Sequence, residues 1–138
     1  MMSPMANKIY GGLAHLFGGL LVVQFFLAGL GAFTTVYNKK FSDSNFNAHA
    51  GLGDLLVLLS LVILLVALVT RRRRAIQLSG ALFAVMVVQL ILGEAGANTA
   101  AWIGGLHAAN ALLILAVTGL TIRDARGTEL APVRASKS

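Results

Sequence analysis

Four apolar segments, each of more than 20 residues, constrain what this chain can fold into more than any other feature. They cover residues 11–33, 48–70, 76–96 and 101–122. A helix needs about 20 mostly apolar residues to cross about 30 Å of hydrocarbon. We therefore predict an all-α fold, a bundle of four transmembrane helices in one domain over residues 1–122. The remaining residues, 123–138, are polar and include a proline, so we predict a disordered tail.

The positions of the charged residues predict the orientation of the bundle. Of the 11 Lys and Arg residues, nine lie on one side of the predicted membrane: Lys8, Arg71, Arg72, Arg73, Arg74, Arg123, Arg126, Arg134 and Lys137. Lys39 and Lys40 lie on the other side. Because short cytoplasmic loops carry the excess of basic residues, we expect both chain ends in the cytoplasm and the protein in the plasma membrane.

The net charge of +6 does not indicate nucleic acid as a partner, because the basic residues gather at the ends of the apolar segments. This distribution is typical of a protein whose partner is the lipid bilayer. The chain has no cysteine, which excludes disulfides, thiolate metal sites and cysteine nucleophiles.

The first and third segments contain a repeat. Residues 22–32 align with residues 87–97 at a constant offset of 65, and Val, Val, Gln, Leu, Gly and Ala coincide. A Gln inside a span is costly and uncommon, so the match of Gln24 with Gln89 is the informative one. After each copy a His-Ala pair follows, at His49 and at His107, near the start of the next helix. The sequence therefore predicts two repeated helical hairpins, each of which supplies one histidine.

His49 and His107 are predicted to lie at one depth, because each stands near the outer start of an inward-running helix. His15 stands near the inner start of the first helix, about 27 Å before Phe33 at 1.5 Å per residue. A b-type haem takes one imidazole nitrogen on each face of its porphyrin plane, and bundle cofactors lie between facing helices. We predict one haem b per chain, held between helices two and four by His49 and His107.

Two other interpretations of the histidine pair stay open. Both residues would also be tolerated near the membrane surface if their rings reached water. A zinc ion is a third possibility, but two ligands leave its tetrahedral shell unfilled.

Several neighbouring residues fit the prediction of a haem. Small residues such as Gly53 flank the histidines and would let a macrocycle pass close to the backbone. Lys39 and Lys40, in the outer loop, would supply positive charge to the propionates. Asn110 lies one turn after His107 on the same face, where it would be a partner for the second ring nitrogen of that ligand.

Gln24 and Gln89 allow two interpretations. The simpler one is a hydrogen bond between helices, worth about 0.6 kcal/mol on average. The other is a hydrogen bond to the haem edge or to a ligand imidazole.

The segment 87–93, followed by a short loop and by the segment 106–113, resembles the heme A synthase family. That family looks like two four-helix halves, each with histidines on its second and fourth helices on the outer side, and this chain resembles one half over nearly all its spans. The resemblance implies that His49 and His107 are haem ligands. The family's catalytic half has a glutamate three residues before a helix-two histidine, where this chain has Phe46, and Gly104 precedes His107 by the same interval. The resemblance therefore implies haem binding without the oxidation of a haem methyl group.

These observations favour a membrane-bound cytochrome b that transfers electrons at the outer face, between a quinol and a redox partner protein. One alternative is a half-size enzyme similar to heme A synthase, which would work as a homodimer or larger oligomer. The other is a cofactor-free accessory subunit of a larger membrane complex.

Overall fold

Four long helices make up most of the computed structural model, which describes residues 4–40, 42–98 and 100–135. They are α1 (Pro4–Asn38), α2 (Asn47–Thr70), α3 (Arg73–Asn98) and α4 (Ala101–Ala135), and a short 3-10 helix, η1 (Asp43–Phe46), precedes α2. No strand occurs among the described residues. All four helices are long and apolar enough to cross a membrane. The predicted all-α fold with four spans is confirmed.

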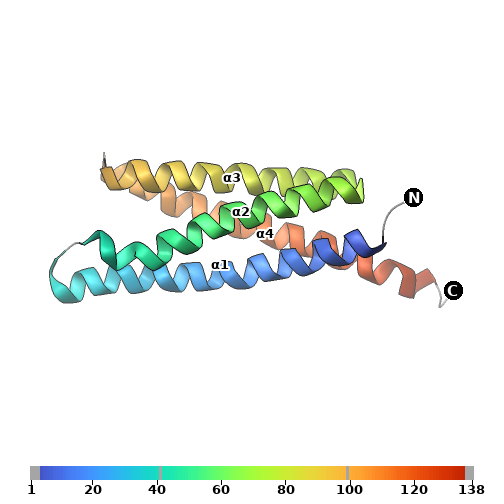
Figure 1. Ribbon diagram of the computed structural model, residues 1–138, viewed down its shortest axis with the longest axis horizontal. Helices are drawn as coiled ribbons and strands as arrows, with labels where there is room; N and C mark the ends of the chain where they lie inside the picture. Colours follow the sequence, from blue (N-terminus) through green and yellow to red (C-terminus); the bar gives the residue numbers. More distant parts are fainter. Residues whose placement is uncertain (1–3, 41, 99, 136–138) are drawn as a thin grey trace.

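The helices form a ring in which each contacts its two neighbours in the chain order α1, α2, α3, α4 and back to α1. Within the described ranges, no backbone contact joins the diagonal pairs α1 with α3 or α2 with α4. Figure 1 shows that α1 begins and α4 ends at the same end of the bundle. We call this end, which also holds the α2–α3 connection, the terminal end, and the opposite one the η1 end.

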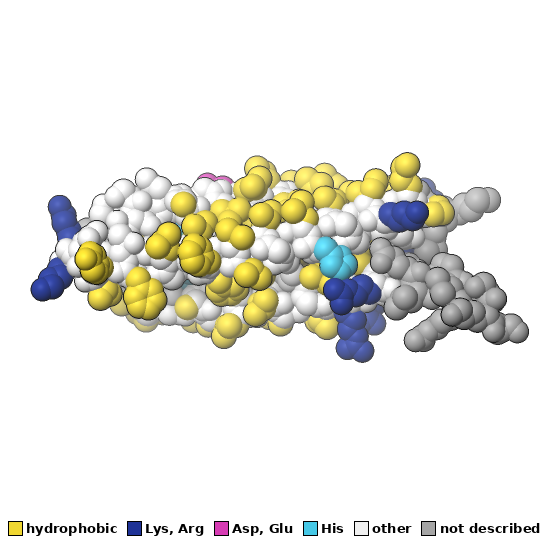
Figure 2. Space-filling view, turned by 90° about the horizontal axis from the view of Figure 1, so that it is seen from below, with side chains coloured by type: hydrophobic (Ala, Val, Ile, Leu, Met, Phe, Trp, Pro, Cys, Tyr) yellow, Lys and Arg dark blue, Asp and Glu magenta, His cyan; other side chains and the backbone are white. Residues whose placement is uncertain are grey.

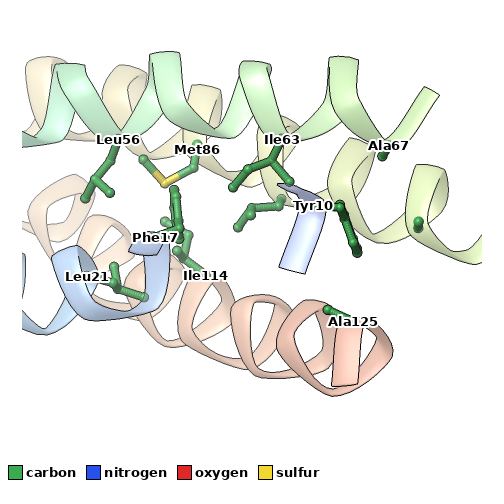
Figure 3. Close-up of a cluster of buried hydrophobic side chains, with 11 residues drawn as sticks. Tyr10, Phe17, Leu21, Leu56, Ile63, Ala67, Met86, Ile114 and Ala125 are labelled. Atoms are coloured by element: carbon green, nitrogen blue, oxygen red, sulfur yellow. The ribbon is translucent and has the colours of Figure 1, made fainter. Parts of the chain in front are cut away.

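The core is built from residues that recur at intervals of three and four along every helix. They are Tyr10, Ala14, Phe17 and Leu21 on α1; Leu56, Ser60, Ile63, Ala67 and Thr70 on α2; Ala75, Ser79, Leu82 and Met86 on α3; and Ile114, Thr118, Thr121 and Ala125 on α4. Figure 3 shows many of these side chains meeting between the helices. This alternating interval is typical of helices that pack with a left-handed crossing, and the small members let the backbones approach closely.

Four of the hydroxyl groups in this core are satisfied within their own helices. Ser60 donates a hydrogen bond to the Val57 carbonyl, and Thr118 donates one to the Ile114 carbonyl. Thr70 and Thr121 likewise donate to backbone carbonyls one turn earlier on their own helices. These four hydroxyls therefore need no partner on another helix.

The outer surface of the bundle is apolar. Large side chains such as Phe26, Phe33 and Leu58 are more than half exposed, at 67%, 76% and 61%. Figure 2 shows hydrophobic side chains along the length of the bundle, with Lys and Arg toward its two ends. A lipid bilayer is the solvent in which such a surface is stable.

The fourth helix is longer than the sequence indicated. A disordered tail was predicted from residue 123, whereas α4 continues to Ala135, and the last three residues of the chain lie outside the described ones. Asp124 accepts hydrogen bonds from the Arg72 guanidinium at 2.9 and 2.8 Å, and Ala125 is buried. The bundle therefore includes residues beyond 122, and the predicted domain boundary at that position is wrong.

Candidate functional site: a histidine pair between two helical hairpins

The core described above ends before the bundle does. Its last members toward the η1 end are Leu21, Leu56, Met86 and Ile114, and beyond them Gly31 is the single buried residue among those whose burial is described. His49 and His107 lie in this part of the molecule, and both are half-buried. The two hairpins separate here, with α1 and α2 on one side and α3 and α4 on the other (Figure 1).

Each histidine is held by the backbone of the preceding helix. His49 Nδ1 lies 3.2 Å from the Gln24 carbonyl oxygen, and His107 Nδ1 lies 3.1 Å from the Gln89 carbonyl oxygen. A carbonyl oxygen only accepts hydrogen bonds, so Nδ1 carries the proton in both rings. The lone pair of each neutral imidazole is therefore on Nε2, the ring nitrogen that could bind a metal ion.

The two rings meet across the bundle. His49 belongs to α2 and His107 to α4, which are diagonal helices, and their ring centroids are 6.2 Å apart with the planes inclined at 70°. The pair therefore brings polar side chains of the two hairpins together in the η1 half of the bundle.

The repeat predicted from the sequence is present in the contacts of the two hairpins. Besides the bond between histidine and glutamine carbonyl, each hairpin has a glycine that touches the residue three positions before its histidine. A Cβ added at Gly31 would lie 2.7 Å from the Phe46 ring, and one added at Gly96 would lie 2.9 Å from the Gly104 nitrogen. The two hairpins thus repeat both contacts. They do so although the glutamine and the histidine are 25 residues apart in the first hairpin and 18 residues apart in the second.

The side-chain amide of Gln89 contacts the other nitrogen of His107. Gln89 Nε2 lies 3.1 Å from His107 Nε2, and because that nitrogen has the lone pair, the amide is the donor. Asn110 donates to Gln89 Oε1 at 2.8 Å and to the Val85 carbonyl at 2.9 Å. Asn110 was predicted to partner His107 directly, but the Gln89 backbone takes that place because α3 runs beside the ring, and Asn110 reaches it only through Gln89.

The side chain of Gln24 makes a different bond from that of Gln89. Gln24 Nε2 donates to the backbone carbonyl of His49 at 2.9 Å. Within the described parts of the chain, no hydrogen bond involves His49 Nε2. Of the two interpretations of the glutamines, the bond between helices describes Gln24 and the bond to an imidazole describes Gln89.

Glycines let the glutamines and histidines approach the neighbouring helices. A Cβ added at Gly53, a predicted site residue, would lie 3.2 Å from Gln24 Nε2. The sequence analysis did not single out Gly93, where a Cβ would lie 3.1 Å from His107 Cε1. The repeat could have indicated this position, because Gly93 aligns with Ala28 of the first copy, so both copies have a small residue there.

The remaining predicted residues lie apart from the rings. Lys39 follows α1 in the left-handed conformation, with φ 52°, and both Lys39 and Lys40 are exposed. His15 Nδ1 lies 2.8 Å from the Gly11 carbonyl oxygen, and its Nε2 accepts a hydrogen bond from Arg126 of α4 at 3.1 Å. His15 therefore has partners of its own in the other half of the bundle.

The pair offers two nitrogen donors and no more. No group of three or more His, Asp or Glu residues gathers as a metal site in the part of the chain that the structure describes. Such a donor set suits a metal ion that brings its other ligands with it, as the iron of haem does. It does not complete the tetrahedral shell of a zinc ion.

Comparison with known proteins identifies a family. A model of a family of unknown function, DUF6220, matches residues 24–98. No curated protein and no solved structure matches the chain. The matched segment includes Gln24, His49 and Gln89 and ends before α4, which carries His107.

Proposed function

The chain belongs to the DUF6220 family, whose function is unknown, and we propose from its own residues that it is a membrane-bound b-type haem protein that transfers electrons. His49 and His107 would hold the iron of one haem b between α2 and α4. The bound haem would supply a one-electron centre whose potential depends on its axial ligands, its burial and the hydrogen bonds around them.

The observation that carries the proposal is the approach of two histidines from diagonal helices. Two imidazoles that bind one metal ion from opposite sides, through bonds of about 2 Å, have ring centroids about 6 Å apart. The centroids of His49 and His107 are 6.2 Å apart. The centroid separation of the two rings therefore supports the proposal.

The hydrogen bonds of the two rings add independent support. Metal-binding histidines usually donate their second N–H to a backbone carbonyl or a carboxylate, which sets the tautomer and the ring orientation. His49 and His107 both do so toward a glutamine carbonyl. Two interfacial histidines that only reach water have no need of such matched partners.

The chain's charges support a location for this site. Nine of the 11 Lys and Arg residues belong to the terminal end by sequence position, so we propose that both termini are cytoplasmic and that the membrane is the plasma membrane. The histidine pair would then lie near the outer face. A quinol or a redox protein is the electron partner that we propose for it, with Lys39 and Lys40 near the propionates.

An absorption spectrum of the full chain, purified in detergent after expression with added haem, tests the proposal. We expect a Soret band and a sharp α band after reduction with dithionite, and we expect the α band to be lost in both His49→Ala and His107→Ala. His15→Ala is the control, because it removes a histidine of the same chain that has separate partners.

A colourless wild-type protein would contradict the proposal and leave the accessory-subunit alternative. Turnover of haem O by the purified protein would favour the enzyme similar to heme A synthase. Phe46 stands against that second outcome, because its ring packs on Gly31 where a catalytic carboxylate would be needed.

A further inference from the structure

We infer that the two histidines differ in role, and that His49 is the permanent haem ligand while His107 is exchangeable for a small neutral ligand such as carbon monoxide. The inference rests on the proposed haem function and deepens it. It follows from the different bonds that the two repeats make at the coordinating nitrogen, Nε2.

The coordinating nitrogen of His107 already has a competing partner. Gln89 Nε2 donates to it at 3.1 Å, so this hydrogen bond would have to be given up for His107 to bind a metal ion. The Nδ1 bond of His107 to the Gln89 carbonyl does not have to change. On release from the metal, the His107 ring would therefore regain a hydrogen bond from this amide.

The amide of Gln89 is held in the orientation that favours this exchange. Asn110 uses both of its N–H groups, one on the Val85 carbonyl and one on Gln89 Oε1. Because the oxygen of the Gln89 amide is taken by Asn110, its nitrogen is the atom that faces His107. The amide nitrogen of Gln89 is therefore the atom that a released imidazole would meet, as it does in this structure.

The equivalent glutamine of the first repeat does not compete for His49. Gln24 donates to the His49 backbone carbonyl at 2.9 Å, and that bond is kept whether or not the ring binds a metal ion. His49 gives up no hydrogen bond of its Nε2 within the described residues. Of the two histidines, His107 is therefore the one that would regain a hydrogen bond at Nε2 on release from the metal.

The second N–H of the same amide would be available to an incoming ligand. A hydrogen-bond donor next to an open coordination position is one of the features by which a haem protein controls ligand binding. Gln89 supplies such a donor on the His107 side. Gln24 does not supply one on the His49 side, because its amide is directed at the backbone.

Carbon monoxide titration of the dithionite-reduced, haem-loaded full chain tests the inference by absorption. We expect carbon monoxide to shift the Soret band of the wild type by displacing His107. Gln89→Met removes the amide that receives His107, so we expect the affinity for carbon monoxide to fall about fivefold, the effect of one hydrogen bond of typical net strength. Gln77→Met is the matched control, since it replaces an exposed glutamine near the start of the same helix.

Histidine variants test the assignment independently. We expect His107→Ala to retain haem and to bind carbon monoxide more tightly than the wild type, and His49→Ala to lose most of its haem. The reverse pattern would overturn the assignment, as would equal affinities for carbon monoxide in Gln89→Met and Gln77→Met. Those results leave the haem protein intact, whereas absence of haem from the wild type would overturn the proposed function together with this inference.

Discussion

Two glycines at equivalent places in the repeat determine how closely each hairpin closes over its histidine. A Cβ at Gly31 would lie 2.7 Å from the Phe46 ring and 2.9 Å from the Asn45 carbonyl oxygen. A Cβ at Gly96 would meet the backbone of Gly104 at 2.9 Å. Backbone atoms cannot rotate away as a side chain can, so any larger residue at these positions has to displace the segment that leads into the histidine helix.

Gly31→Ala should therefore lower the free energy of unfolding by about 1–3 kcal/mol, the usual cost of overpacking. Gly29→Ala is the control, because an added Cβ there has no neighbour within 4 Å. Alanine also has the higher helix propensity, by about 1 kcal/mol, so the control should be neutral or stabilising. Unfolding in detergent, followed by circular dichroism, measures both. Equal stabilities of the two variants would contradict the close approach.

Among the elements, the α2–α3 connection and α4 are joined by an ion pair. One guanidinium nitrogen of Arg72 donates hydrogen bonds to both carboxylate oxygens of Asp124. Arg74 Nε lies 3.6 Å from the same carboxylate. The side chains of Arg72 and Asp124 are only 16% and 5% exposed. This contact explains why α4 has to continue past residue 122, and it links the two hairpins at the terminal end, away from the histidines.

Asp124→Asn should destabilise the bundle by about 2–3 kcal/mol, because it leaves the largely buried Arg72 charge without its counter-ion. Asp54→Asn removes an exposed carboxylate and should change stability by less than about 0.5 kcal/mol. Replacing both partners, Arg72→Met with Asp124→Leu, should restore most of the loss, since an apolar pair of similar size often matches a buried ion pair. Unfolding in detergent compares the three. A double variant less stable than Asp124→Asn would show that the pair has a role beyond charge neutralisation.

For the whole molecule, the basic residues distinguish the two ends of the bundle. The Arg71–Arg74 block joins α2 to α3 at the terminal end, and Lys39 and Lys40 lie at the η1 end. An asymmetry of nine basic residues against two is enough to orient a bundle with short loops. The histidine pair lies in the η1 half, so under the proposed function the orientation would also decide from which side an electron partner approaches.

The orientation can be measured with single cysteines, since the chain has none of its own. Ser44→Cys places a thiol in η1, and Gly127→Cys places one near the terminal end of α4; both positions are exposed. In intact cells we expect a membrane-impermeant maleimide to label only Ser44→Cys, and to label Gly127→Cys after lysis. The opposite labelling would place the termini outside.

The number of spans, their hairpin repeat and the pairing of His49 with His107 could all be predicted from the sequence. Span length is set by bilayer thickness, and two residues near equivalent helix starts share a depth in any antiparallel bundle. These properties depend on order and spacing along the chain alone, so they needed no knowledge of which side chains touch.

The tertiary structure alone decided which atoms meet. It directed Gln89 to the His107 ring and Gln24 to the His49 backbone, although the two glutamines match in sequence. His107 Nδ1 is bonded to the backbone carbonyl of Gln89 instead of to Asn110. Helix α4 continues far enough for Asp124 to bind Arg72, which lies 52 residues earlier in the chain. Such contacts depend on the distance and rotation between helices, which are set by the packing of the whole bundle and which no local sequence pattern records.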